Sequence, residues 1–403
     1  MGAMLSFFAK CAASSAISGF AANRLLSSSM LPRPICLLGT GIASLAGLVY
    51  YVKVWVQDFY FDWSYNDSRD LTGRTAVVTG GTAGGLGCAA AELLYQQGAE
   101  VIITVRSKEK GDRALRKLKE HTSTSINNDR ASYVLCDFLS ETSVRNSIAE
   151  IKERTNGGID FLILNAGMSG QSSTKTGPKQ KVSAGTDAKI KKDIAAKVWM
   201  SNHVGPWILA QELMPSLIQA AKRNPSSDPR VVWVSSGAHK KAVIDWEDPF
   251  HPSRERAGVA VSPYSQSKLA NIMHAREYQK RVRELLWQGS KENTENDSID
   301  VKCISVTPGL VWTSMIPKIP LLYPFFWFIM RSPTKGAQVI KMACLDKDLK
   351  GGEYLSNCYI KQSEGINGCS NDEELWKQLW ELTAKQVEEK EYEELSETNK
   401  KTK

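Results

Sequence analysis

Short apolar runs alternate with longer amphipathic stretches from Arg74 onward, and this alternation limits the fold more than any other feature. The apolar runs are typical of buried strands, and the amphipathic stretches have helical spacing. Strands that alternate with helices predict an α/β fold, with a parallel sheet covered on both faces. Right-handed crossovers make it a doubly wound parallel sheet of Rossmann type. The predicted strands are Thr75–Thr79, Val101–Val105, Tyr133–Cys136, Phe161–Leu164, Val231–Val234 and Val301–Val306.

The predicted helices lie between these strands, and together they form a single catalytic domain that we place at residues 71–365. A C-terminal amphipathic helix is expected over residues 366–390. A charged, disordered tail is expected over residues 391–403. The predicted helices of the domain are Cys88–Gln97, Asp112–His121, Ser143–Arg154, Ile190–Ala221 and Leu269–Leu286.

Residues 1–57 contain no Asp or Glu, and we interpret them as an N-terminal targeting or anchor segment. Within them, residues 35–52 form an 18-residue run without a charged side chain. That length is just enough to cross a bilayer as a helix. We therefore predict a transmembrane helix and an N-terminal membrane anchor, with a buried core helix as the alternative.

Signals at the two ends of the chain bear on location and assembly. Residues 1–30 are rich in Ser and Ala and free of acids, as organelle transit peptides are. The last four residues, Lys400 to Lys403, resemble a dilysine endoplasmic-reticulum retrieval tail. We predict a membrane location in the endoplasmic reticulum, with the mitochondrion or another organelle as the alternative. A homodimer is a candidate assembly.

The composition argues against several other classes of protein. Eight cysteines include no C-x-x-C pair, and five histidines show no zinc-type spacing. We therefore predict neither a disulfide scaffold nor a metal site. The net charge is +8, but no nucleic-acid motif accompanies it, so no nucleic-acid partner is expected.

The first strand runs into a glycine-rich loop, Thr79–Gly87, and a helix follows. Glycines let backbone N–H groups approach a pyrophosphate at the start of a helix. This context predicts a dinucleotide site. The loop positions that we assign to cofactor binding are Gly80, Gly84, Gly85, Leu86 and Gly87.

Arg106 follows the second strand, at the place where an NAD-binding chain would carry a carboxylate. An arginine suits the 2′-phosphate of NADP instead. We therefore expect NADP (NADPH) as the cofactor, with NAD less likely.

Tyr264 and Lys268 stand four residues apart, which places them on one face of a helix. A free tyrosine has a pKa near about 10, so it is a poor proton donor or acceptor at neutral pH. A neighbouring cation favours the phenolate and lowers that pKa. The pair suits proton transfer to or from a carbonyl or alcohol oxygen.

These motifs together make the chain from about Leu71 to Leu382 resemble the short-chain dehydrogenase/reductases. The resemblance is greatest to their membrane-anchored, retinol-dehydrogenase-like branch. The motifs occur in the family's order: the glycine loop, Cys136-Asp137, Asn165-Ala166-Gly167, Ser201–Gly205, Val234-Ser235-Ser236, Tyr264 with Lys268, and Pro308-Gly309.

The resemblance implies four catalytic residues. Tyr264 would be the general acid/base, and Lys268 would lower its pKa while holding the nicotinamide ribose. Ser236 would hydrogen-bond the reacting oxygen, and Asn202 would anchor a water-linked proton relay. Such donors suit the negative charge that develops on oxygen during hydride transfer.

The resemblance also implies further cofactor-binding residues. Asp137 would accept from the adenine amino group, and Asn165 would steady the sheet edge beside the cofactor. Thr313, five residues after Pro308, would hydrogen-bond the carboxamide. The remaining positions of this set are Ala166, Gly167, Pro308 and Gly309, and Tyr264 and Lys268 also belong to it.

The chain departs from the family pattern at the glycine loop and beyond. The family spaces its glycines at zero, four and six, and counting from Gly80 places the third on Leu86. One extra residue in the loop is therefore expected to weaken cofactor binding. Leu164 stands at the first asparagine of the family's Asn-Asn-Ala-Gly motif. The stretch from 165 to 202 is long, with seven lysines between Lys175 and Lys197.

An apolar segment, Ile316–Met330, stands where the family carries its substrate lid, and it contains three prolines. With the anchor, it indicates a lipophilic substrate: a retinoid, an isoprenoid or a steroid. We predict an NADP-dependent short-chain dehydrogenase/reductase that acts on CH–OH groups at a membrane. The alternative is a catalytically weak nucleotide-binding scaffold or lipid-binding protein at a membrane.

Overall fold

The structure is a computed structural model, and it falls into two units. One unit comprises residues 1–64 and 318–331, and the other comprises residues 65–317 and 332–403. The residues that it describes are 16, 18–21, 24, 33–55, 64–120, 130–155, 158–170, 184–224, 228–259, 261–289, 300–313, 326, 330–363 and 365–401; side chains are left out at 33–37, 54–55, 184–188, 287–289 and 390–401.

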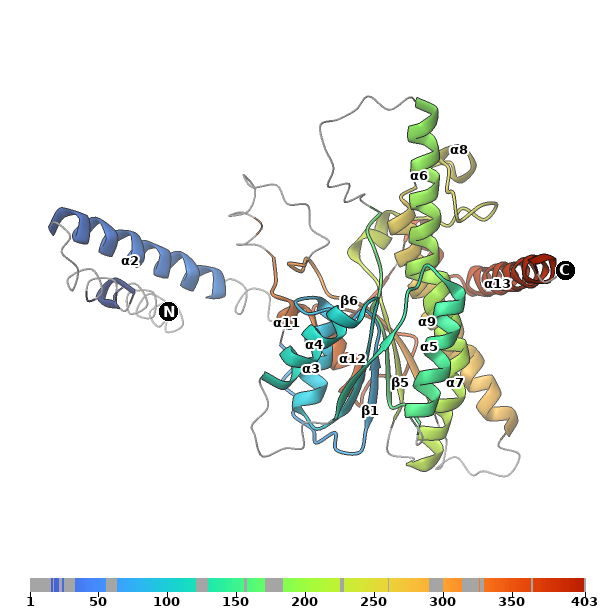
Figure 1. Cartoon of the computed structure of the whole chain (residues 1–403), viewed down its shortest axis with the longest axis horizontal. Helices are drawn as coiled ribbons and strands as arrows, with labels where there is room; N and C mark the ends of the chain where they lie inside the picture. The colour runs from blue at the N-terminus through green and yellow to red at the C-terminus, as the bar shows by residue number, and fades with distance from the viewer. Residues whose placement is uncertain are drawn as a thin grey trace. The chain divides into compact units, whose positions relative to one another are not determined.

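The larger unit is built on an eight-stranded sheet, with strand order β3-β2-β1-β4-β5-β6-β7-β8 (Figure 1). Every neighbouring pair is parallel except β7 and β8. The strands are β1 Thr75–Val78, β2 Glu100–Val105, β3 Ala131–Leu135, β4 Phe161–Leu164, β5 Arg230–Val234, β6 Lys302–Thr307, β7 Tyr354–Ser356 and β8 Tyr359–Lys361. The strand order reverses between β1 and β4, so the predicted doubly wound sheet is confirmed.

The sequence predicted six of the eight strands, because β1 to β6 carry near-continuous apolar runs. The last two strands have three residues each, and all three residues of β8 are exposed. They pair as a hairpin through Asn357 and Cys358, which both have positive φ. A short exposed strand has no apolar run to predict it from.

Helices cover both faces of the sheet, and each face has its own apolar core (Figure 1). One core packs under α3, α4 and α12, and the other under α5, α7, α9 and α13. The bounds are α3 Leu86–Gln96, α4 Lys108–Glu120, α5 Glu141–Arg154, α7 Gly205–Arg223, α9 Pro263–Gly289, α12 Gln338–Leu345 and α13 Glu373–Lys401, with short helices α8 Arg254–Ala257 and α11 Pro333–Gly336.

The predicted helix Ile190–Ala221 consists of three consecutive elements. α6 spans Ala184–Trp199, a π-helical turn η2 spans Met200–Val204, and α7 follows from Gly205. In η2 the Gly205 N–H donates to the Met200 carbonyl, five residues back. π-helical turns are rare and frequently occur at functional sites.

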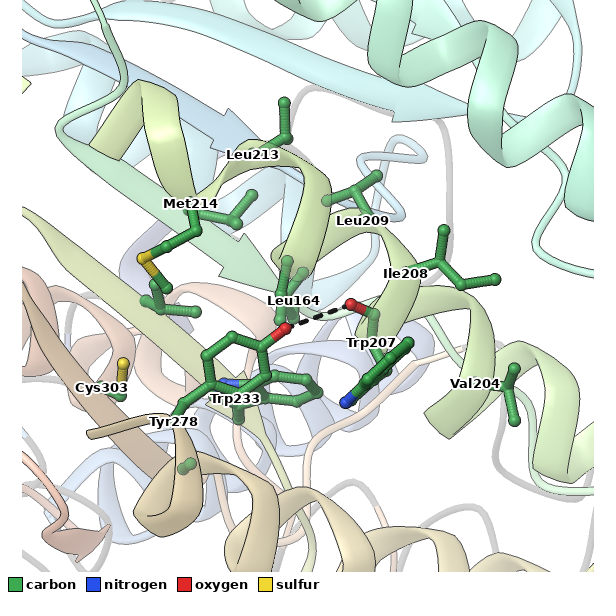
Figure 2. Close-up of a cluster of buried hydrophobic side chains, with 14 of the residues drawn as sticks. Leu164, Val204, Trp207, Ile208, Leu209, Leu213, Met214, Trp233, Tyr278 and Cys303 are labelled. Carbon is green, nitrogen blue, oxygen red and sulfur yellow. Dashed lines mark hydrogen bonds between the residues drawn. The ribbon is translucent and has the colours of Figure 1, made fainter. Parts of the chain in front are cut away.

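The core between β5, α7 and α9 contains large aromatic side chains (Figure 2). Trp233 of β5 and Tyr278 of α9 lie with their ring centroids 5.6 Å apart. The buried Tyr278 hydroxyl donates to the Trp207 carbonyl at 3.3 Å, which links α9 to α7.

The smaller unit contains α2, which spans Arg33–Trp55 and includes the predicted run 35–52. A helix therefore forms there, but no helix in the described part of the chain is both long enough and apolar enough to cross a membrane. The predicted transmembrane anchor is thus not supported.

Two other predictions fall partly or wholly outside the described residues. The apolar segment Ile316–Met330 is described only at Phe326 and Met330, and the lysine-rich stretch is described only from residue 184.

The C-terminal helix extends to Lys401, through the residues expected to form a disordered tail. Glu and Lys are strong helix formers, which accounts for the longer helix.

Candidate active site

The predicted site residues stand at the carboxyl ends of the parallel strands. The glycine loop follows β1, Asn165 follows β4, Ser236 follows β5 by two residues, and Pro308 follows β6. Parallel strands place these ends along one edge of the sheet. Residues far apart in the sequence are thereby collected at the position where the strand order reverses.

The glycine loop leads directly into α3, and the N-cap residue Gly85 has no side chain to cap the helix. The first N–H groups of a helix have no partner within it, and they form an anion-binding end. Gly80 and Gly84 both have positive φ, which L-residues with a side chain avoid. The loop backbone therefore fits a pyrophosphate.

The extra loop residue lies ahead of Gly87, in the loop that leads into α3. The close approach belongs to Gly87: a Cβ there would lie 2.7 Å from the Gly80 carbonyl oxygen and 2.5 Å from the Asn165 amide nitrogen. Leu86, where simple counting placed the third glycine, is the first residue of α3, and its side chain packs against the core.

Thr79 and Asn165 join the ends of β1 and β4. The Thr79 hydroxyl accepts from the N–H groups of Asn165 and Ala166, each at 2.9 Å. The Asn165 amide donates to the Thr79 carbonyl at 2.9 Å. These bonds hold the loop beside Asn165, Ala166 and Gly167.

Tyr264 lies near the start of α9, and its phenol lies beside the Ser236 hydroxyl. Burial raises the pKa of Tyr264, and the neighbouring Ser236 hydroxyl opposes that rise only in part. The sequence predicted a Tyr264 pKa lowered by the neighbouring cation. The structure shows the opposite direction, because burial disfavours the phenolate.

The Ser236 hydroxyl has a backbone partner. It caps the short helix η4, Gly237–Lys241, by accepting from the Ala238 N–H at 3.3 Å. The serine therefore satisfies local backbone and also faces Tyr264.

Lys268 lies one helical turn after Tyr264 and is almost fully buried. Its ammonium donates to the Val234 carbonyl at 2.9 Å and lies 5.8 Å from the centroid of the Tyr264 ring. Burial lowers the pKa of Lys268 to about 8. Ser235 fixes the same turn of α9 to β5, since its hydroxyl donates to the Lys268 carbonyl at 2.6 Å.

Asn202 lies in the middle of η2 and is fully buried. Its side-chain oxygen accepts from the Met168 N–H at 2.7 Å. Its amide donates to the Met168 carbonyl at 2.9 Å and to the Ser267 hydroxyl at 3.1 Å. Ser267 in turn donates to the Tyr264 carbonyl, so Asn202 braces the start of α9 against the segment after β4.

Gly167 lies where these groups meet. A Cβ at this position would lie 3.0 Å from the Asn202 side-chain oxygen and 3.5 Å from the Lys268 nitrogen. The structure therefore brings together Asn165 to Gly167, Asn202, Ser236, Tyr264 and Lys268.

The remaining predicted residues lie at the same edge of the sheet but further from this cluster. Arg106 is exposed at the end of β2, and the half-buried Asp137 follows β3 and accepts from the Leu139 N–H at 3.1 Å. Gly309, after β6, has positive φ, and Thr313 is half-buried.

The sequence interpretation gave no role to Thr79 or Ser267. A signal for both was present, since Thr79 ends the first apolar run and Ser267 lies within Tyr264–Lys268. Three residues after Tyr264, a hydroxyl shares its helix face and can bond back to its carbonyl.

The fold and this cluster define a class of nucleotide-dependent enzymes, and sequence comparisons agree. A family model described as short chain dehydrogenase matches residues 74–247. Dehydrogenase/reductase SDR family member 13 of Bos taurus is 29% identical over 327 residues, 78% of this chain and 73% of that protein. Human polyprenol dehydrogenase is 28% identical over 312 residues, 76% and 83% of the two chains.

Solved structures share the fold. A protein of Mycobacterium paratuberculosis, 24% identical, aligns with a TM-score of 0.51 over 80% of this chain and 96% of its own. Pseudomonas aeruginosa RhlG, 21% identical, aligns with a TM-score of 0.52 over 72% and 97%. These comparisons support the short-chain dehydrogenase/reductase family of oxidoreductases for this chain, and its relatives agree with the retinol-dehydrogenase-like branch at moderate identity.

Proposed function

We propose that the protein is an NADP-preferring oxidoreductase that interconverts an alcohol and a carbonyl on a lipophilic substrate. The observation that carries this proposal is the position of the Tyr264 phenol beside the Ser236 hydroxyl, one helical turn from the buried Lys268. Two hydroxyl donors beside a cation suit an oxygen atom that gains or loses a proton during the reaction.

The residues present fit a dinucleotide cofactor. The uncapped start of α3 and the positive-φ glycines at 80 and 84 would hold its pyrophosphate. When bound, a nicotinamide dinucleotide supplies the hydride for reduction or accepts it in oxidation.

Tyr264 is the proposed proton donor in the reducing direction. Because burial keeps its pKa above the ordinary value, the phenol carries its proton at neutral pH. Ser236, which lies beside that phenol, would hydrogen-bond the same substrate oxygen. A negative charge that develops on the oxygen then meets two donors in a half-buried environment.

Lys268 and Asn202 support this pair. With a pKa of about 8, Lys268 is mostly protonated at pH 7, so a cation lies beside the phenol. The side-chain amide of Asn202 is occupied by Met168 and Ser267. We therefore propose that this side chain braces the site and that any water-linked relay there uses backbone groups.

Arg106 carries the proposed preference for NADP. It is exposed, and Ser107 beside it caps the start of α4 by accepting from the Lys110 N–H at 3.5 Å. A guanidinium next to a helix start suits a 2′-phosphate. The RhlG structure, which shares this fold, is an active-site complex with NADP.

The substrate class is proposed from relatives. Polyprenol dehydrogenase takes its name from a long isoprenoid alcohol, and it matches most of this chain. We therefore propose an isoprenoid or retinoid alcohol and its aldehyde, with a steroid as a further candidate.

The first test is a fluorescence titration of the full-length protein with NADPH and NADH, followed by turnover assays with retinal and a polyprenal. We expect selective NADPH binding and reduction of at least one aldehyde. Failure to bind either nucleotide would overturn the proposal. Tight binding without turnover on any carbonyl would favour a nucleotide-binding scaffold.

The coenzyme argument has its own test. Arg106→Glu should weaken NADPH binding at least about tenfold and leave NADH nearly unchanged, because only NADPH carries the 2′-phosphate. Arg113→Glu, an exposed change one turn along α4, is the matched control. An equal loss for both nucleotides in Arg106→Glu would remove the argument.

We propose the endoplasmic reticulum as the location, from the lysines at the C-terminus. Replacing Lys400 and Lys401 with serine should move the protein out of this compartment in fluorescence microscopy. An unchanged distribution would contradict the proposal.

A further inference from the structure

The C-terminal helix α13 contacts the π-helical turn that carries Asn202. Thr383 and Gln386 of α13 bond to side chains at the two ends of η2. These contacts lie outside the cluster of predicted catalytic residues, and none of that cluster belongs to α13.

The hydroxyl of Thr383 is buried and has three partners. It donates to the Leu379 carbonyl at 2.8 Å within α13. It lies 3.0 Å from Nε2 of His203 and 3.4 Å from Nε2 of His274. Because its one proton goes to Leu379, the hydroxyl oxygen can only accept from the two imidazoles. Thr383 thus joins η2, α9 and α13 at one atom.

Gln386 holds the other end of the π-helical turn. Its side-chain oxygen accepts from the indole N–H of Trp199, the residue directly before η2, at 3.2 Å. The Trp199 ring also packs on His203, with centroids 4.2 Å apart. One turn of α13 therefore fixes both Trp199 and His203, and Asn202 lies between them in the chain.

A π-helical turn needs such support, because its hydrogen-bonding pattern is rarely adopted without it. Asn202 reaches Met168 and Ser267 from the position that this turn gives it. If η2 relaxed to α-helix, the residues after it would rotate, and Asn202 would lose one or both partners.

The rest of α13 is attached to α9 independently. Arg276 lies over the Trp376 ring at 5.5 Å, Arg281 lies over the Trp380 ring at 4.4 Å, and Lys280 pairs with Glu373 at 3.0 Å. Losing the Thr383 hydroxyl should therefore leave α13 in place while freeing the π-helical turn.

We propose that Thr383, assisted by Gln386, is a positioning residue: α13 holds the π-helical turn so that Asn202 supports the reaction. This inference rests on the proposed function for the role of Asn202 in turnover. The contacts that position Asn202 can be tested without turnover.

The test compares Thr383→Val, Thr383→Ser and Val339→Ala in the full-length protein. Valine has the shape of threonine without the hydroxyl, and serine restores the hydroxyl. Val339 is buried in α12, in the core under the opposite face of the sheet, so it serves as a destabilised control. Three quantities are measured: kcat and KM, NADPH affinity, and hydrogen exchange of residues 199–205.

We expect Thr383→Val to lower kcat about tenfold or more, since small misplacements of a catalytic group are costly. NADPH affinity should stay within about twofold, hydrogen exchange of residues 199–205 should accelerate, and Thr383→Ser should restore both kcat and exchange. Val339→Ala should change neither.

The proposal is overturned if Thr383→Val lowers kcat no more than Val339→Ala, or if exchange at 199–205 is unchanged. A wild-type protein without turnover would refute the proposed function instead. In that case the exchange measurement alone decides whether α13 holds the turn.

Discussion

The two faces of the sheet are packed in different ways. The core under α3, α4 and α12 consists mainly of Ala, Val, Ile and Leu, and its described members include no tryptophan. The core under α5, α7, α9 and α13 buries four tryptophans, at 199, 207, 233 and 380. We call this side of the sheet the aromatic face and the side under α3, α4 and α12 the aliphatic face. The aromatic face also contains two histidines whose rings pack together, His203 and His274.

The difference follows from what each face must bring together. On the aliphatic face, small residues let α3 lie close to β1, and this closeness places the start of α3 at the glycine loop. On the other face, large rings join α13 to α7 and α9, and they join α9 to β5. The aromatic face thus includes α9, which carries Tyr264 and Lys268. It also includes the rings and the Thr383 hydroxyl that contact Trp199 and His203 at η2.

The largest expected effect is a loss of turnover, and it should occur at only one of two tyrosines in α9. Tyr264→Phe should lower turnover about 10³-fold with little change in stability, because it removes a proton donor. Tyr278→Phe should keep turnover and cost about 1 kcal/mol of stability, because it removes the buried bond to the Trp207 carbonyl. Kinetics and urea unfolding of both variants check this. Unchanged turnover in Tyr264→Phe would refute the mechanism.

The next prediction compares the faces along one strand. Trp233 and Val232 are neighbours on β5 and point into opposite cores. Trp233→Ala should cost about 3–5 kcal/mol of unfolding free energy, and Val232→Ala roughly 2 kcal/mol. Denaturant unfolding of both variants measures the difference. Equal losses would mean that the aromatic rings are not the main support of their face.

The aromatic face should also make stability depend on pH. Burial lowers the pKa of His203 to about 3 and that of His274 well below its ordinary value. Below about pH 6.5 the unfolded chain binds protons at both residues while the folded chain does not. The free energy of unfolding is therefore highest above pH 6.5 with respect to these two groups. It falls as the pH drops, by up to about 1.4 kcal/mol per pH unit for each histidine.

Urea unfolding between pH 7 and pH 5, above the range in which most carboxylates titrate, measures this slope. His274→Phe keeps an aromatic ring among Trp207, Trp233 and Trp380 and should flatten it. An identical slope in the variant would show that the buried pair does not control the pH dependence.

The smallest effect concerns Lys268. Because burial lowers its pKa to about 8, the ammonium loses its proton as the pH rises through that value. In the reducing direction, kcat/KM should then fall above about pH 8, approaching tenfold per pH unit. A profile that stays flat to pH 9.5 would contradict a role for the charged lysine.

Local patterns predicted the sheet well, since the strands β1 to β6 were predicted within two residues at each end. The four residues proposed as catalytic, Asn202, Ser236, Tyr264 and Lys268, lie close together in the structure. Counting along the sequence did less well in the glycine loop, where Gly87 takes the place assigned to Leu86. Spacing cannot show how a turn accommodates an extra residue, because that depends on the neighbouring strand.

The sequence by itself determined the class of fold, because strands and helices alternate along the domain and each has its own periodicity. It also indicated the glycine loop and the pair Tyr264 and Lys268, which we propose for cofactor binding and proton transfer. It indicated a lowered pKa for Tyr264, whereas the pKa is raised, because the direction of the shift depends on burial. It also predicted one continuous helix where η2 interrupts it. Only the tertiary structure decided these points and the support that Thr383 gives to Asn202, because both burial and contacts 180 residues apart arise from packing.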